Sequence, residues 1–274
     1  MSNLSEAAAE TVRLEPVVEP DWRSGFTNLL QLEIRRWWAT WRGWGLLAVM
    51  TVLINGLLAY GLWIDPSRGS GGSSPEFVAG TFDVLLFWMS ILSVMATIFL
   101  AQDALIGEKQ AGVAAWILSA PVARGAYILA KFSGYAAGLL AATVWLPGLP
   151  IYLQFSLGEG RWLPAVPFIA AYLLQSLYVL FYLALVIALG AFVSSRAAVL
   201  AAAFAVLIGQ PFLINLVEDA APPIAWALPA RLPELARFVH RSEPLPSSAG
   251  IVLALVFAAV FLALAVWRFA REEL

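Results

Sequence analysis

The 274-residue chain is too apolar for an ordinary soluble protein, with 61% hydrophobic and 12% charged residues and a mean hydropathy of +0.82. Soluble domains carry roughly 25% charged residues, so most of this surface is expected to face membrane lipid. The net charge of −2 gives no positive field for nucleic acid, and a chain without Cys and with one His offers no thiolate or paired-histidine metal site. The composition predicts an all-α integral membrane protein without a metal or cofactor of its own.

The chain begins with an acidic stretch, 1–22, which is expected to be a disordered cytoplasmic tail. An amphipathic segment follows at 26–43, with Trp and Leu near one helical face and Arg mostly on the other. That pattern is typical of a helix lying in the membrane interface. Gly43 and Gly45 favour a bend before the first span, although an N-terminal extension of that span is the alternative.

Six stretches then reach the roughly 20 apolar residues that a membrane helix needs. Prolines 147 and 150 interrupt the third stretch, and Gln210-Pro211 is expected to kink the fifth. Gly134 and Gly138 form a GxxxG pattern in the third, which permits close helix packing. The spans are expected at about 44–64, 77–101, 126–157, 164–193, 197–217 and 251–269.

The distribution of Lys and Arg predicts the orientation. Eleven of the 16 fall on the side of the N-terminus, so the positive-inside rule places both termini in the cytoplasm. The protein is expected in the cell's inner or plasma membrane. On the other side, the loop at 65–76 is rich in Gly and Ser. The loop at 218–250 is long and punctuated by Pro, and 232–241 has the pattern of a short helix. A structured outer cap is expected there, with a mobile loop as the alternative.

The stretch between the second and third spans holds both lysines, Lys109 and Lys131. Glu108 suits the start of a helix, where an acid interacts well with the helix dipole. Pro121 forces its predecessor away from helical geometry, so a short helix is expected to end at about Ser119. Tied at both ends to membrane helices, it would shift the second and third spans together. A solvated loop shaped only by the positive-inside rule is the alternative.

In this stretch the chain resembles the membrane subunit of type-2 ATP-binding-cassette (ABC) exporters. That family shows an acid, then Glu with a basic neighbour, Gly, a short apolar helix, Ser-x-Pro-Val-x-Arg, and a Lys opening the third span. The resemblance covers most of the chain from about residue 22, although Val113 and Ala115 stand where the family often has Thr and an acid. The matching residues here are Asp103, Glu108, Lys109, Gly112, Ser119, Pro121, Arg124 and Lys131.

The resemblance implies a type-2 ABC exporter transmembrane fold in which segment 103–124 is a coupling helix that docks on an ATPase. The chain has no Gly-x-x-x-x-Gly-Lys-Ser/Thr phosphate loop. ATP hydrolysis, with its ATP and Mg, is therefore expected on a separate subunit, and this chain is expected to be non-catalytic. Two ATPase copies and a second permease copy or homologue are the implied partners. The implied coupling residues are those matched above from Asp103 to Arg124.

Polar residues within the spans are candidates for a transport path, because charge at depth in a membrane is costly and usually functional. In the resembled family the second and fifth spans line the path at the dimer interface. Asp83, Phe87, Gln210 and Asn215 are therefore hypotheses for path-lining residues. The alternative for Asp83 is an interfacial acid within reach of water at the outer leaflet.

Several functions compete. ATP-driven export is the leading hypothesis, and the apolar spans favour an amphipathic or lipid-like cargo. A secondary carrier driven by an ion gradient would need buried titratable groups near the midplane, which the spans lack. An intramembrane protease would need a general base or a His-Glu-x-x-His motif, and the one His lies in an outer loop. An ABC-type complex that transmits mechanical force without moving cargo is not distinguished from export.

Overall fold

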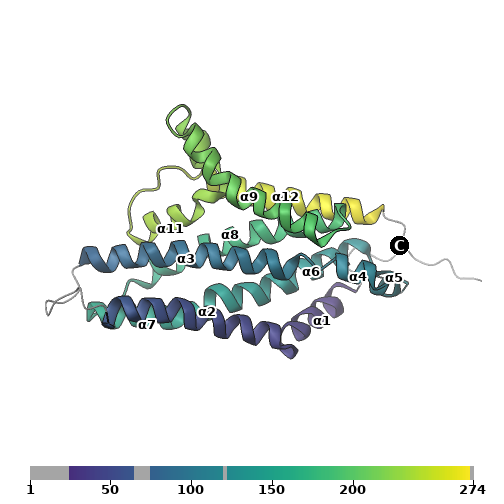
Figure 1. Ribbon diagram of the computed structural model, residues 1–274, viewed down its shortest axis with the longest axis horizontal. Coiled ribbons are helices and arrows are strands. Elements are labelled where there is room, and N and C mark those ends of the chain that lie inside the picture. Colours follow the sequence, from purple (N-terminus) through teal and green to yellow (C-terminus); the bar gives the residue numbers. More distant parts are fainter. Residues whose placement is uncertain (1–24, 65–74, 120–121, 272–274) are drawn as a thin grey trace, which may run out of the picture.

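The computed structural model describes residues 25–64, 75–119 and 122–271. Throughout these ranges the chain forms helices and turns, with no strand. Six of the helical stretches are long and apolar enough to cross a membrane. Most of them run along the long axis of the molecule, whereas the one at Arg196–Val217 slants away from the others (Figure 1). The predicted all-α membrane fold with six spans is confirmed.

Each predicted span has a counterpart among these helices. The candidate spans are Trp41–Trp63, Gly80–Gln110, Arg124–Glu159, Ala165–Phe192, Arg196–Val217 and Ala249–Ala270. The elements in chain order are α1 (Phe26–Ala39), α2 (Trp41–Ala59), the π-helical turn η1 (Tyr60–Ile64), α3 (Pro75–Ala101), α4 (Ile106–Gln110), α5 (Val113–Leu118), α6 (Arg124–Leu140), the π-helical turn η3 (Ala141–Trp145), α7 (Leu146–Glu159), α8 (Ala165–Phe192), α9 (Arg196–Val217), α10 (Pro222–Ala227), the 3₁₀ turn η4 (Pro229–Arg231), α11 (Leu232–His240) and α12 (Ala249–Ala270).

The amphipathic segment and the first span meet at a break that lies earlier than predicted. Helix α1 ends at Ala39, and Thr40 has extended backbone angles, φ −105° and ψ 154°. The bend expected at Gly43 and Gly45 is therefore wrong, because both glycines lie inside α2. A Cβ on Gly43 would stand 2.5 Å from the carbonyl oxygen of Trp37. Gly43 therefore permits the end of α1 to press against the start of α2.

Proline changes the hydrogen bonding of the third span without ending it. Pro147 has no N–H for the carbonyl of Thr143, four residues earlier. The helix widens into the π-helical turn η3, which ends at Trp145, just ahead of this proline, and the hydroxyl of Ser93 on α3 donates to the Thr143 carbonyl at 3.4 Å. Helix α7 then continues through Pro150, and α9 likewise continues through Pro211.

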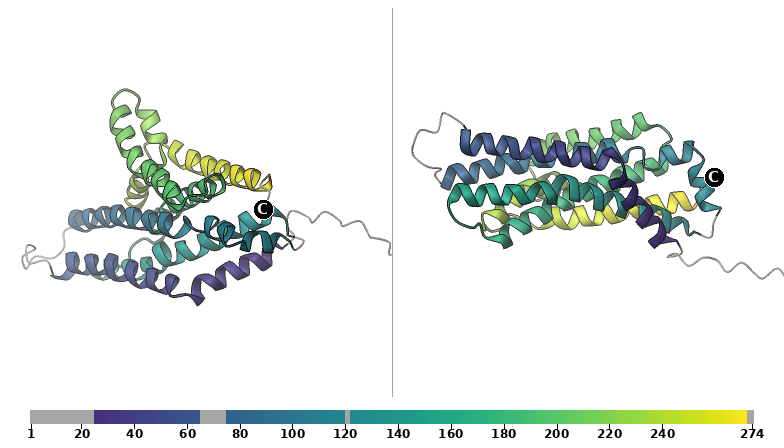
Figure 2. Two further views of the ribbon diagram at one scale, coloured as in Figure 1. Left: turned by 45° about the vertical axis from the view of Figure 1, so that its right-hand side comes forward. Right: turned by 90° about the horizontal axis from the view of Figure 1, so that it is seen from below.

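The GxxxG pattern of the third span packs one helix of this chain against another. A Cβ on Gly134 would lie 2.4 Å from the Cβ of Glu33, and a Cβ on Gly138 would lie 2.2 Å from the Trp37 indole. Only glycine permits this approach of α1 to α6. At the centre of the bundle α8 packs against α3, α11 and α12, and most of its length is buried (Figure 2).

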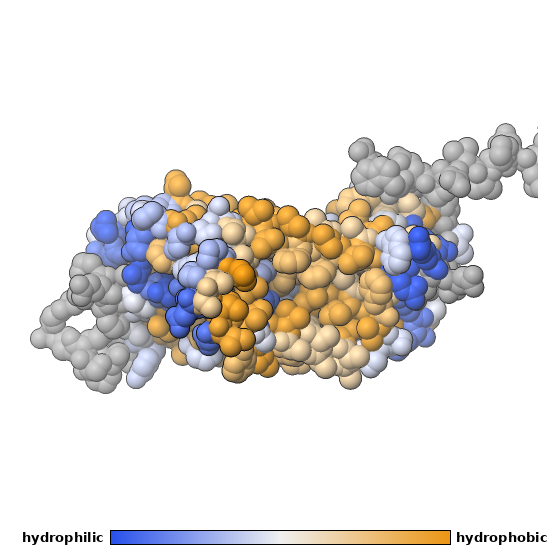
Figure 3. All heavy atoms as spheres, turned by 90° about the horizontal axis from the view of Figure 1, so that it is seen from above, coloured by the Kyte–Doolittle hydropathy of each residue, from blue (hydrophilic) through white to orange (hydrophobic). Residues whose placement is uncertain are grey.

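The surface has an apolar band between two polar ends (Figure 3). One end carries α4, α5, the start of α6 and the end of α12, and the other carries α11 (Figure 1). The short helix predicted at 232–241 is present as α11. The tail predicted at 1–22 lies outside the described residues, as does most of the loop predicted at 65–76.

Candidate functional site

The segment between α3 and α6 forms two short helices, so the prediction of a single helix is wrong. Helix α4 ends because Gly112 adopts a left-handed conformation, φ +68°, and its N–H donates to the carbonyl of Lys109 at 3.1 Å. This is the usual way in which glycine terminates a helix. Helix α5 then ends at Leu118, close to the predicted end at Ser119. Pro121, to which that end was assigned, lies outside the described residues.

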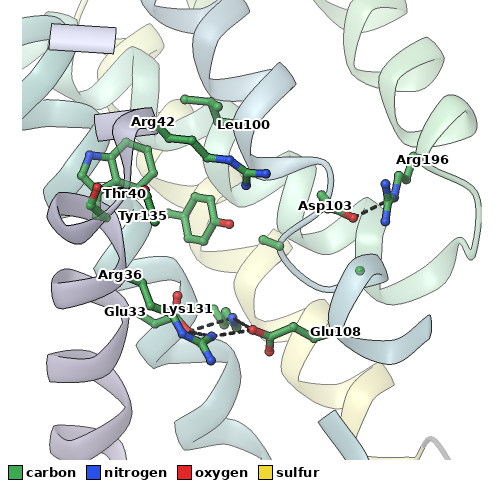
Figure 4. A pocket seen from close by; sticks show the side chains of 13 residues that line it. Glu33, Arg36, Thr40, Arg42, Leu100, Asp103, Glu108, Lys131, Tyr135 and Arg196 are labelled. Carbon is green, nitrogen blue, oxygen red and sulfur yellow. Dashed lines mark hydrogen bonds and ion pairs between the residues drawn. The ribbon is translucent and has the colours of Figure 1, made fainter. Parts of the chain in front are cut away.

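The side chain of Glu108 points into the protein rather than away from it (Figure 4). Its Oε1 accepts hydrogen bonds from Lys131 and, at 2.8 Å, from Arg36, and its Oε2 accepts from the Tyr127 hydroxyl. The Lys131 ammonium also lies 2.8 Å from Glu33 Oε1. We call these five residues the ionic cluster.

The ionic cluster joins three helices that are far apart in sequence. It links α1 through Glu33 and Arg36, α4 through Glu108, and α6 through Tyr127 and Lys131. Lys131 is 3% exposed and Glu33 is 9% exposed. Buried charges persist only when they are paired and hydrogen-bonded, so this arrangement fixes the position of α4 against α1 and α6.

The other charged residues predicted in this segment also form bonds inside the chain. Asp103 lies 2.7 Å from Arg196 at the start of α9. Lys109 donates to a carbonyl in the last turn of α8 at 3.4 Å, and Gln110 donates to the chain just after that helix at 3.2 Å. Arg124 donates to a carbonyl at the end of α12 at 3.0 Å. Together with the ionic cluster, these bonds connect the segment to five other helices.

Trp116 is the prominent surface residue of the segment, and it is not among the predicted coupling residues. Its side chain is 78% exposed on α5. Gly112 and Ser119, both predicted coupling residues, are exposed on either side of it. A large aromatic residue exposed at a polar end is typical of a contact surface for another protein. One signal in the sequence could have identified it. Trp116 stands among small Ala residues in a short stretch bounded by the helix breakers Gly112 and Pro121.

A second candidate site is a cavity of about 700 Å³ between α3, α8, α9 and α11. Three of the four predicted path residues, Asp83, Phe87 and Asn215, line it. Its polar end also includes Arg231, Glu234 and Arg237, and its apolar part includes Ile91, Met95, Phe204, Leu207 and Ile208. We call it the amphipathic cavity.

The fourth predicted path residue, Gln210, has a different position. Its Nε2 donates to the Tyr182 hydroxyl at 3.2 Å, and its Oε1 accepts from the backbone N–H of Ala230 at 3.0 Å. Gln210 is 9% exposed. It therefore anchors α9 to α8 and to the start of the α11 region, next to the amphipathic cavity.

The charged end of the amphipathic cavity is held by paired residues. Asp83 accepts a hydrogen bond from Arg241, directly after α11, and forms an ion pair at 3.4 Å with Arg237 on α11. Burial lowers the pKa of Arg231, but its hydrogen bonds to Glu234 and Glu218 outweigh that effect and raise it. These contacts bind α11 to the adjacent ends of α3 and α9.

The single histidine lies in the same region and is neutral at pH 7. Its ring stacks on Phe82, with ring centroids 3.6 Å apart and planes 19° apart. Burial, with a smaller contribution from Arg241, lowers the pKa of His240 to about 4. The uncharged ring therefore serves as an aromatic group that packs the end of α11 against α3.

The family comparison agrees with this arrangement. A family model described as an ABC-2 family transporter protein matches residues 27–274. No curated protein matches the chain. The matched range includes α4, α5 and all six candidate spans. ABC-2 membrane proteins work with an ABC ATPase subunit. The chain thus belongs to the ABC-2 family of transporter proteins, as a membrane permease subunit of an ABC transporter.

Proposed function

We propose that the protein is the permease of an ATP-driven exporter and that α4 and α5 form its docking element for the ATPase. The observation that carries this proposal is the exposed Trp116 on a segment that is bonded to five other helices. Trp116 would enter a groove on the ATPase as an aromatic anchor. ATP and Mg would sit on that subunit. Two copies of the permease and two of the ATPase would complete the complex.

The bonds inside the segment explain how a push on α5 would spread through the molecule. The ionic cluster would transmit it to α1 and α6, and the Asp103–Arg196 ion pair would transmit it to α9. Lys109 and Arg124 contact the ends of α8 and α12. Under this proposal Glu108 and Arg124 are positioning residues, while Gly112, Trp116 and Ser119 form the contact surface.

The distribution of charge supports a cytoplasmic position for the docking element. Arg36, Arg42, Lys131 and Arg196 lie close to Asp103 and Glu108, at the end of the molecule that carries α4 and α5 (Figure 4). Basic residues at one end of a membrane bundle favour the cytoplasmic side. The described chain starts and finishes at this end (Figure 1), so both termini would lie in the cytoplasm beneath the cell's inner or plasma membrane.

The amphipathic cavity supports an amphipathic or lipid-like cargo. Its volume of about 700 Å³ lies within the roughly 300–1,000 Å³ of small-molecule sites. One end presents Asp83, Asn215 and Arg237, and the rest is apolar. A polar headgroup would lie at the charged end and an acyl or other apolar part beside α9. This cavity favours transport of cargo over a complex that only transmits force.

Paired tryptophan variants test the docking role. We expect Trp116→Ala to remove cargo-stimulated ATPase activity in proteoliposomes that contain the permease and its ATPase. Trp162→Ala is the matched control, because Trp162 is 72% exposed at the opposite end of the third span. Both variants should insert and fold normally. Equal ATPase stimulation in Trp116→Ala and the wild type would contradict the docking role.

Paired leucine variants test the cargo site. Leu207→Trp would fill part of the amphipathic cavity and should reduce cargo export while leaving basal ATPase activity intact. Leu216→Trp is the control on the same helix, since Leu216 is 77% exposed and does not line the cavity. A similar export rate in both variants would exclude this cavity from the transport path.

A further inference from the structure

A second polar cavity, of about 580 Å³, lies between the α1–α2 elbow and the turn from α3 to α4. Four cationic side chains line it, those of Arg36, Arg42, Lys131 and Arg196, together with three carboxylates. The lining therefore carries an excess of one positive charge. We call it the elbow cavity.

The carboxylates of the elbow cavity already have cationic partners. Glu33 and Glu108 contact Lys131 and Arg36, and Asp103 contacts Arg196. Among the described residues, these pairings account for three of the four cations.

The fourth cation is Arg42, which forms no ion pair or hydrogen bond with any residue in the described part of the chain. Figure 4 shows its side chain extending from the elbow into the space between Tyr135 and Leu100. The Tyr135 hydroxyl also makes no hydrogen bond to a described residue. The elbow cavity thus presents the Arg42 guanidinium and the Tyr135 hydroxyl to an anion, with the apolar side chain of Leu100 beside them.

Two exposed tryptophans indicate the depth of the elbow cavity in the membrane. Trp41 and Trp44, on either side of Arg42, are 81% and 55% exposed. Tryptophan prefers the interface between lipid headgroups and acyl chains. Arg42 therefore lies where phospholipid phosphates lie, and basic pockets between helices at this depth suit anionic headgroups.

We propose that the elbow cavity binds the phosphate of an anionic phospholipid, with Arg42 as its cation and the Tyr135 hydroxyl as a second donor. A free phosphate offers the same anionic group, but a lipid would also cover the apolar surface of Trp41 and Trp44. The bound lipid would join the elbow to the turn that carries Asp103. It would stabilise the arrangement of α1 and α4 that the docking element needs.

The binding test uses the purified chain in micelles of detergent with phosphatidylcholine. Phosphatidylglycerol is titrated in, and bound lipid is counted by native mass spectrometry while the melting temperature is followed. We expect saturable binding of phosphatidylglycerol that Arg42→Ala weakens about tenfold, the effect of losing one charge-assisted hydrogen bond. Arg42→Lys should retain part of the affinity for phosphatidylglycerol, and Tyr135→Phe should weaken that affinity several-fold.

Arg35→Ala is the matched control, because Arg35 is exposed on α1 and does not line the elbow cavity. It should bind phosphatidylglycerol as the wild type does. Equal weakening by Arg35→Ala and Arg42→Ala would indicate general surface attraction and overturn the proposal. Inorganic phosphate serves as a separate arm. If it saturates the site and displaces the lipid, the ligand is free phosphate and the lipid assignment is wrong. No ATPase is needed, so this test is independent of the docking proposal.

Discussion

Replacing Lys131 with Met would remove the cation on which the ionic cluster depends. Its ammonium lies 2.8 Å from the Glu33 carboxylate and also donates to Glu108. Met is similar in length and apolar, so the side chain would still fill its place. The main loss would be electrostatic, since two carboxylates would share a site in which Glu33 is 9% exposed.

The contacts that Glu33 and Glu108 keep after the substitution determine how much unfolding free energy is lost. Removal of one partner from a buried ion pair costs about 3–5 kcal/mol. Glu108 would keep its bonds to Arg36 and Tyr127, and Glu33 would keep Arg36 at 3.4 Å. We therefore expect Lys131→Met to lower the free energy of unfolding by about 3 kcal/mol, at the lower end of that range.

The assay is reversible unfolding in mixed micelles, followed by the fluorescence of the 12 tryptophans. Lys109→Met is the control with the same change of side chain. Lys109 donates to a carbonyl at 3.4 Å and lies 5.3 Å from the centre of the Phe269 ring. It is half-buried, whereas Lys131 is buried, so the loss of its charge should cost less than the loss of the Lys131 charge.

A double-mutant cycle then isolates the ion pair. Glu33→Gln in the Lys131→Met background should cost much less than Glu33→Gln in the wild type, with a coupling of about 1–3 kcal/mol. The reasoning is refuted if Lys131→Met is as stable as Lys109→Met, or if the two substitutions of the cycle are additive.

Three further predictions concern packing and pH. Because the pKa of His240 is about 4 when folded and about 6.5 when unfolded, the unfolded state binds more protons between those values. The free energy of unfolding should therefore fall as pH drops from 6.5 to 4. The loss at pH 5, relative to neutral pH, should be up to about 2 kcal/mol. His240→Phe keeps the stack on Phe82 and should flatten this dependence in melts at pH 5 and 7. Gly138→Ala would place a Cβ 2.2 Å from an indole of α1 and should cost about 1–3 kcal/mol of unfolding free energy, whereas Gly125→Ala, with its nearest neighbour at 3.4 Å, should cost much less. Gln210→Leu would leave a backbone N–H and a tyrosine hydroxyl without their partner and should cost about 1–3 kcal/mol; a melting temperature equal to that of the wild type would contradict this.

The sequence was a good guide to features that depend on nearby residues. A membrane span is a continuous apolar run, so its existence and approximate bounds can be read locally. The helix α11 also has local signals, with Pro233 in its first turn and His240 in its last. By contrast, Gly43 suggested a bend, but its role is to allow Trp37 at the end of α1 to pack closely against the start of α2. That role depends on how α1 meets α2, which the sequence around Gly43 does not specify.

The candidate site was predicted only in part, for a similar reason. The acid and lysine of the motif were identified, but their mutual contact was not, and neither was the contribution of Glu33 and Arg36 from α1. These contacts join residues far apart in the chain and depend on the close packing of α1 on α6. Trp116 was missed because composition does not reveal whether an aromatic residue in a short helix faces the protein or the solvent.

The central claim is that α5 contacts the ATPase, and the absence of cysteine from the chain permits a direct test. Single cysteines are introduced by Trp116→Cys and Trp162→Cys at positions that are 78% and 72% exposed. Each is labelled with a photoactivated cross-linker in membranes that contain the complete complex. Cross-linking of the ATPase subunit from position 116 and none from position 162 is the predicted result. No ATPase adduct from position 116, or equal adducts from both positions, would contradict the account.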